Sequence, residues 1–298
     1  MAISFFTVRV LAKLKEGHED DEKRAMWTQR AEATWRDLVL QNADCNEYYK
    51  GLLANQGIDL GLFGSLPLSS NNDPFLANIN DENRKRALDI LRAYFSAKPD
   101  TAPHRLFLDV STGQDFIELI KPYLTNGLTK GIPSLFADVK PLYKDPFKRQ
   151  VIQDTAEVLH TAYSPTDHPA GNSVDPTAYL WTLYFLAQHY SFLGHHKHAL
   201  EILDTATEHT PTLPELYMMR ARTLKRAGDP FGAVKAMEAA RMLDGQDRFI
   251  NTKTGKYFLR AGMPEKADEI LHLFTKVRGL HEVASCHSFI SERRRRCQ

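Results

Sequence analysis

The chain has 298 residues, of which 43% are hydrophobic and 25% are charged, a composition that supports a sizeable buried core and excludes disorder throughout. Its 38 Lys and Arg residues nearly balance its 37 Asp and Glu residues, so the overall charge indicates neither a nucleic-acid binder nor an enzyme for acidic substrates. The three cysteines, Cys45, Cys286 and Cys297, show neither CxxC spacing nor the even count of a disulfide framework, which predicts a reducing compartment.

The first 14 residues are apolar at helical spacing and lead into a second helical pattern. This stretch is too short to span a bilayer, contains Arg9 and Lys13, and lacks the ordered regions of a signal peptide. We therefore expect a cytoplasmic protein whose sequence begins within a helical array.

Residues 1–163 predict helical repeats of degenerate sequence. Residues at the spacing typical of the second helix of a helix pair occur twice, at Ala31, Trp35 and Leu38 and at Ala87, Leu91, Tyr94 and Pro99. Residues 48–53 predict the start of the intervening first helix. The segment at about 57–81 is rich in Gly, Ser, Asn and Asp and predicts a long loop.

Residues 164–177 predict a linker that leads into three regular units at 178–279, where the sequence repeats with a period of 34 residues. Three registers share this period, namely Gly194, Gly228 and Gly262; Ala199, Ala233 and Ala267; and Ala187, Ala221 and Gly255. This period is typical of tetratricopeptide (TPR) repeats, whose unit is a pair of antiparallel helices that meet closely at small residues. With no convincing strand pattern elsewhere, we predict an all-α, TPR-type superhelix, or α-solenoid.

The period is lost in the last residues, 280–298, which predict a disordered or divergent tail. Its terminal sequence ERRRRCQ, which includes Arg293 to Arg296, resembles a nuclear-localisation or nucleic-acid motif, and a disordered end is the alternative interpretation.

Motifs for catalysis are missing from the sequence. It contains no P-loop, no Gly-rich pyrophosphate turn after a strand, and no recognisable pairing of nucleophile and base, so we expect a protein that is not an enzyme. The segment with His195, His196 and His198 has neither Cys nor carboxylate partners in a ligand arrangement. A polar turn between helices explains it better than a metal site.

A local excess of positive charge is the main candidate for binding. Residues 220–260 contain ten Lys or Arg and four Asp or Glu. Two pairs of cations occupy equivalent repeat positions, namely Arg222 with Lys256 and Arg226 with Arg260. Lys225 and Lys253 lie within one turn of them. We expect these side chains to line the concave groove, where converging cations suit a polyanion. A solvated basic face and a site for carboxylate-terminated peptides are the alternatives.

Several longer strings resemble one family. They are EYYKGL at 47–52, KGIPSLFADVKPLY at 130–143, the segment 180–217, and DRFINTKTGKYFLRAG at 247–262. In order and spacing they are similar to the middle of auxiliary subunits of N-terminal acetyltransferase A, over residues from about 24 to about 275. The family's subunits are several times longer, so the resemblance implies a central piece.

The resemblance implies a scaffold that wraps around a separate catalytic subunit near the ribosome, while that partner acetylates nascent N termini. It also implies an inositol hexakisphosphate site at positions matching Arg222, Lys225 and Lys253. We extend this site to Arg248, Lys256 and Tyr257. No membrane partner and no specific nucleic-acid sequence are expected. A general TPR adaptor for acidic or carboxylate-terminated peptides is the alternative function.

Overall fold

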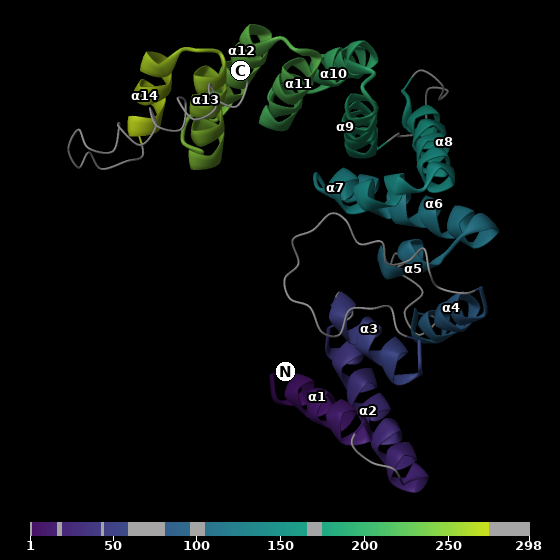
Figure 1. The fold of residues 1–298 in the computed structure, drawn as a ribbon. Coiled ribbons are helices and arrows are strands. Elements are labelled where there is room, and N and C mark those ends of the chain that lie inside the picture. Colours follow the sequence, from purple (N-terminus) through teal and green to yellow (C-terminus); the bar gives the residue numbers. More distant parts are fainter. Residues whose placement is uncertain are drawn as a thin grey trace, which may run out of the picture. The chain divides into compact units, whose positions relative to one another are not determined.

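The computed structural model describes residues 2–16, 20–42, 45–58, 81–95, 105–165 and 175–273, which contain helices and no strand (Figure 1). The all-α, helical-repeat architecture predicted from the sequence is confirmed. None of the described helices combines the length and the apolar character needed to cross a bilayer.

The chain divides into two compact units, 1–181 and 182–298. The boundary lies within helix α9 (Pro176–Leu193), just after the linker predicted at 164–177. Residues 166–174 of that linker, 59–80 of the predicted long loop and the whole tail at 280–298 lie outside the described residues, so those assignments stay predictions.

In its described residues the first unit contains eight α-helices before α9. They are α1 (Ala2–Glu16), α2 (Asp21–Gln41), α3 (Asn46–Asn55), α4 (Asp81–Phe95), α5 (Arg105–Val110), α6 (Gly113–Thr129), α7 (Leu135–Val139) and α8 (Pro146–Tyr163), with the 3-10 helix η2 (Lys140–Lys144) between the last two.

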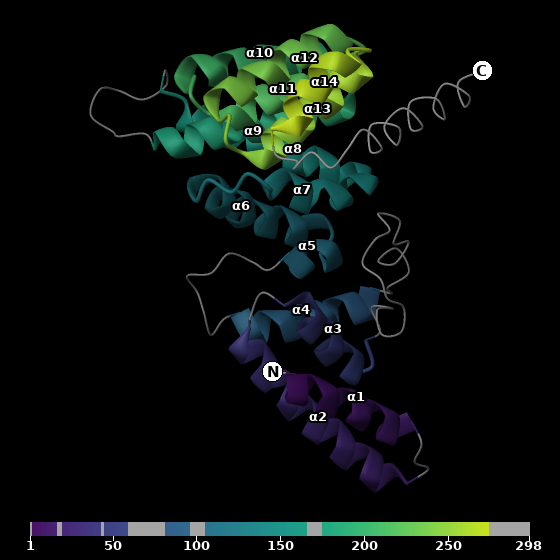
Figure 2. The ribbon, with the colours of Figure 1, turned by 90° about the vertical axis from the view of Figure 1, so that its left-hand side faces the viewer.

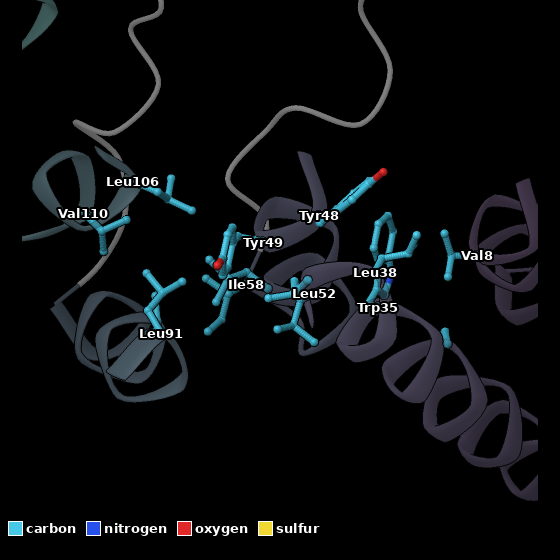
Figure 3. Packing of buried hydrophobic residues seen from close by; sticks show 14 of the residues in the cluster. Val8, Trp35, Leu38, Tyr48, Tyr49, Leu52, Ile58, Leu91, Leu106 and Val110 are labelled. Carbon is cyan, nitrogen blue, oxygen red and sulfur yellow. The ribbon is translucent and has the colours of Figure 1, made fainter. Parts of the chain in front are cut away.

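A continuous apolar core joins α1 to α5 (Figure 3). The predicted second-helix positions are buried, namely Ala31, Trp35, Leu38, Ala87 and Leu91. Tyr94 lies in α4, but its side chain and Pro99 are outside the described part of the chain. The indole of Trp35 packs against Gly51 of α3 so closely that a Cβ there would lie 2.3 Å from its Cζ2 atom. Only glycine allows this approach.

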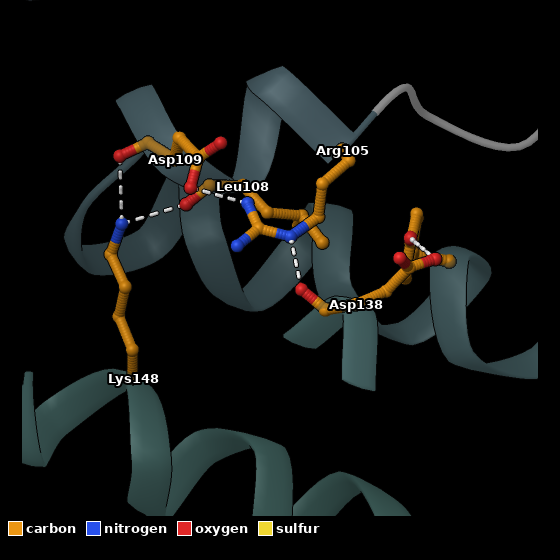
Figure 4. Close-up of polar contacts among 6 residues, drawn as sticks. Arg105, Leu108, Asp109, Asp138 and Lys148 are labelled. Carbon is orange, nitrogen blue, oxygen red and sulfur yellow. Dashed lines mark hydrogen bonds and ion pairs between the residues drawn. The ribbon is translucent and has the colours of Figure 1, made fainter. Parts of the chain in front are cut away.

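A buried lysine holds the short helix α5 against α8 (Figure 4). Lys148 is 6% exposed, and its ammonium donates hydrogen bonds to the carbonyl oxygens of Leu108 at 2.7 Å and Asp109 at 3.0 Å. These carbonyls belong to the last turn of α5, which has no further residues to satisfy them. Arg105 adds an ion pair to Asp109 and a 2.8 Å hydrogen bond to the carbonyl oxygen of Asp138.

The described part of the second unit contains three successive helix pairs, drawn in green to yellow in Figures 1 and 2. They are α9 with α10 (His196–His209), α11 (Pro214–Ala227) with α12 (Pro230–Leu243), and α13 (Arg248–Arg260) with α14 (Pro264–His272).

The predicted 34-residue registers match the turns and contacts of these pairs. Gly194, Gly228 and Gly262 follow the first helix of each pair with φ of 90°, 89° and 76°, the left-handed conformation that ends helices at glycine. Ala187 and Ala221 are fully buried. A Cβ at Gly255 would lie 2.8 Å from Leu271 Cγ, so the third position is also a close contact between paired helices.

Candidate polyanion site on the second unit

The first helices of the three pairs, α9, α11 and α13, differ sharply in charge from the second helices. Together they contain eight Lys or Arg side chains but a single acidic one, Glu215. The second helices carry seven Asp or Glu. Among the described helices of this unit, the positive charge is therefore concentrated on α11 and α13.

Local capping sets the position of α13. The Asp247 carboxylate accepts hydrogen bonds from the backbone N–H groups of Phe249 at 2.6 Å and Ile250 at 3.4 Å. Asn251 is buried, and its amide donates to the carbonyl oxygens of Gly245 and Asp247, at 2.8 Å each. The turn between α12 and α13 is thereby held by several polar contacts, so the cations that follow on α13 are firmly placed.

Six cations form what we call the cationic face: Arg222, Lys225, Arg226, Lys253, Lys256 and Arg260. The first three lie within about one turn of α11, and the other three follow a spacing of three and four residues on α13, which places them on one side of the helix. Tyr257 lies between the helices and is 7% exposed. Its ring centroid is 5.8 Å from Lys225 Nζ and 5.5 Å from Arg260 Cζ, so this ring connects both helices through cation–π contacts.

The cations lie close enough to perturb one another. Burial lowers the pKa of Lys225, and the charges of Arg260, Arg226, Arg222 and Lys253 lower it further. Lys253 also has a lowered pKa, because of burial and then because of Arg222, Lys256 and Arg260.

Burial raises the pKa of the Tyr257 phenol, whereas the nearby arginines act in the opposite direction. In the described residues no carboxylate comes within ion-pair distance of any of the six cations. An uncompensated cluster of this kind favours an anionic ligand.

Comparisons with known proteins agree with the resemblance. Residues 19–288 match the family model described as "N-terminal acetyltransferase A, auxiliary subunit". The chain belongs to this auxiliary-subunit family. Human "N-alpha-acetyltransferase 16, NatA auxiliary subunit" is 39% identical over 178 residues, which cover 58% of this chain and 21% of the relative.

The Arabidopsis thaliana "N-terminal acetyltransferase A complex auxiliary subunit NAA15" is 31% identical over 252 residues, covering 83% of this chain and 26% of the relative. A solved chain in "Structure of Naa15/Naa10 bound to HypK-THB" matches with a TM-score of 0.68 and 30% identity, covering 87% of this chain and 36% of that one. The chain thus spans about a quarter of the length of its curated auxiliary-subunit relatives.

Five of the six site residues predicted from the sequence lie close together on the second unit: Arg222, Lys225, Lys253, Lys256 and Tyr257. Arg248 differs. It is the first residue of α13 and lies five residues before Lys253. At this spacing the two side chains point about 140° apart around the helix axis. No described contact joins Arg248 to the cationic face, although it shares the helix.

Arg226 and Arg260 are members of the cationic face that the family resemblance did not include, although their shared repeat position is visible in the sequence. The guanidinium of Arg226 also donates a 3.1 Å hydrogen bond to Ser191 Oγ of α9. Tyr184 of α9 is another neighbour of the cationic face, close to Arg222. Burial raises the pKa of its phenol, Arg222 lowers it and Glu215 raises it, so both charges are close to this side chain.

Two of the three histidines of the α9–α10 turn, His195 and His198, lie against an aromatic ring. Tyr190 has ring centroids 6.3 Å from His195 and 4.4 Å from His198, and His198 Nδ1 is 3.4 Å from a Glu201 carboxylate oxygen. Nowhere in the described ranges are three or more His, Cys, Asp or Glu side chains grouped to hold a metal ion.

Proposed function

We propose that this chain acts as a non-catalytic scaffold within an N-terminal acetyltransferase A complex, wrapping and positioning a separate catalytic subunit that modifies nascent chains. Membership of the auxiliary-subunit family supports this role, as does the similarity to a chain from a complex that contains Naa10. The cytoplasm, in association with ribosomes, is the place where such a complex meets its substrates. The enzymatic chemistry belongs to the partner.

We further propose that the cationic face binds inositol hexakisphosphate as a structural ligand. The observation that carries this proposal is the convergence of six cations from α11 and α13, which have no acidic partner among the described residues. Each charge-assisted contact contributes about 1.5 to 3 kcal/mol before screening and coupling reduce the sum. A ligand with six phosphate groups can form contacts with more of these cations at once than a single carboxylate can.

Calorimetry tests the ligand. We expect inositol hexakisphosphate to bind the chain in complex with its catalytic partner, and Lys225→Glu to weaken binding by at least about tenfold, because one contact is lost and one repulsion is gained. Lys235→Glu is the matched control, since Lys235 is exposed on the second helix α12. Equal affinities of the wild-type and Lys225→Glu proteins would remove the assignment of this site.

An acetylation assay tests the scaffold role. The purified chain alone should show no acetyl-CoA turnover, and activity should appear or increase when the catalytic subunit is added. Turnover by a preparation free of any partner would overturn the non-catalytic role. Failure to co-purify with a catalytic N-terminal acetyltransferase subunit would contradict the scaffold itself.

A second candidate function is a general TPR adaptor for acidic or carboxylate-terminated peptides. The placement of the cations on first helices, where TPR grooves are lined, favours it. Fluorescence anisotropy with a labelled acidic peptide separates the two functions. A peptide affinity higher than that for inositol hexakisphosphate would favour the adaptor.

A further inference from the structure

Glu215 is the one acidic side chain of the first helices α9, α11 and α13. It lies in the first turn of α11, seven residues before Arg222. Seven residues are nearly two helical turns, so the two side chains share a face and are separated by about 10 Å along the axis. Glu215 Oε2 is buried and accepts no hydrogen bond from the described residues.

Tyr184 of α9 lies near both Glu215 and Arg222. Burial is the main reason that its pKa is raised, but Arg222 and Glu215 both act on the phenol, with opposite sign. The two charges therefore act on one neighbouring side chain. Going along α11 from its C-terminal half to its first turn, a ligand passes from the cations of the face to a lone carboxylate.

The cations themselves occupy a small area. On α11 they extend over four residue steps, from Arg222 to Arg226, and on α13 over seven, from Lys253 to Arg260. At about 1.5 Å per residue this is roughly 6 and 10 Å along the two helices. Lys225 Nζ of α11 lies 5.8 Å from the centre of the Tyr257 ring of α13, so the cations of the two helices adjoin one another in one footprint.

We propose that Glu215 is a specificity-determining residue, which restricts the cationic face to compact polyanions by repelling linear ones that extend along α11 beyond Arg222. This inference rests on the proposed polyphosphate site. It also distinguishes two kinds of polyphosphate that differ in shape. An inositol polyphosphate keeps its phosphates within the footprint. A linear polyphosphate that runs along the helix brings some of its phosphates close to the Glu215 carboxylate.

The distances set the size of the effect. A carboxylate about 10 Å or more from a compact ligand acts through water and salt, so its removal by Glu215→Gln should tighten inositol hexakisphosphate binding by about threefold or less. Phosphates of a linear chain that pass within about 5 Å are screened much less, and their binding should tighten by about tenfold. Glu215→Lys should enlarge both changes and keep their order.

The experiment measures both ligands on the complex by calorimetry, with inositol hexakisphosphate and linear inorganic polyphosphate of defined length as probes. Glu208→Gln removes the same charge from the exposed surface of the second helix α10 and is the matched control. Circular dichroism of each variant reports whether the helices are retained, and Glu215→Lys serves where Glu215→Gln changes the helix content. We expect the ratio of the two affinities to shift toward the linear ligand only in the Glu215 variants.

The possible results separate the two proposals. If the wild-type complex binds neither probe, the polyphosphate site itself is wrong. If the wild type binds inositol hexakisphosphate but both Glu215 variants keep its selectivity, or shift it toward the compact ligand, the role of Glu215 is wrong while the site stands.

Discussion

The buried Lys148 predicts an unusual pH dependence of stability in the first unit. Burial lowers the pKa of its ammonium to about 8, even though Asp109 and Asp145 act in the opposite direction. An unfolded lysine releases its proton near 10.5. Between these values the unfolded chain binds more protons than the folded one, so the free energy of unfolding rises with pH. Well below pH 8 both states are protonated, and the contribution of Lys148 does not change.

The size of this rise follows from the two pKa values. Each unit of pKa difference corresponds to about 1.4 kcal/mol, and integration from pH 7 to pH 9.5 gives an increase of about 2 kcal/mol. The upper limit is chosen because Tyr123 titrates near 12 in the folded protein, a raised pKa due first to burial and then to Asp138. Unfolded tyrosines release protons earlier, so above about pH 10 the tyrosines reduce stability.

Urea unfolding followed by tryptophan fluorescence measures the free energy of unfolding of the first unit, because Trp27, Trp35 and Trp181 all belong to that unit. We expect the wild type to gain about 2 kcal/mol relative to Lys148→Met between pH 7 and 9.5. Lys148→Arg removes the titration as well, since a guanidinium stays charged in this range, but it keeps a donor. Parallel pH curves for the three proteins would refute the reasoning from burial.

Three further results are expected. Gly51→Ala should destabilise the first unit by about 1 to 3 kcal/mol in the same fluorescence assay, because its Cβ would overlap the Trp35 ring; an unchanged urea midpoint would mean that the ring moves freely. Gly228→Ala should lower the thermal midpoint by circular dichroism at a cost of about 1 kcal/mol, whereas Gly245→Ala, whose Cβ meets only the Arg241 carbonyl oxygen at 3.6 Å, should be tolerated; equal midpoints would contradict the need for a left-handed residue. Inositol hexakisphosphate binding should weaken as salt increases, and a salt-insensitive affinity would indicate a contact not dominated by charge.

Much of the second unit can be predicted from the sequence because its information is local and periodic. A glycine that ends a helix in the left-handed conformation is required by the backbone at that position, as at Gly228, whatever the rest of the chain does. The same holds for small residues such as Ala221, which recur wherever two paired helices touch. A repeat of 34 residues therefore reports the architecture directly.

The candidate site is only partly encoded in this way. The period places Arg222 and Lys256 at equivalent positions, and it also relates Arg226 to Arg260, although the family resemblance omitted that pair. Helical rotation then separates Arg248 from them, which a count of charges along the sequence does not reveal. The position of Tyr257 between two helices depends on how α11 and α13 pack together.

The sequence by itself determined the helical repeats, their glycine turns and the excess of cations on the first helices. Only the tertiary structure decided which charges share a neighbourhood and which are buried. Lys148 is the clearest example, because its contacts at Leu108 and Asp109 lie 40 and 39 residues away in the chain. Periodicity reports neighbours within a repeat, whereas a contact between degenerate repeats depends on packing and leaves no periodic signal.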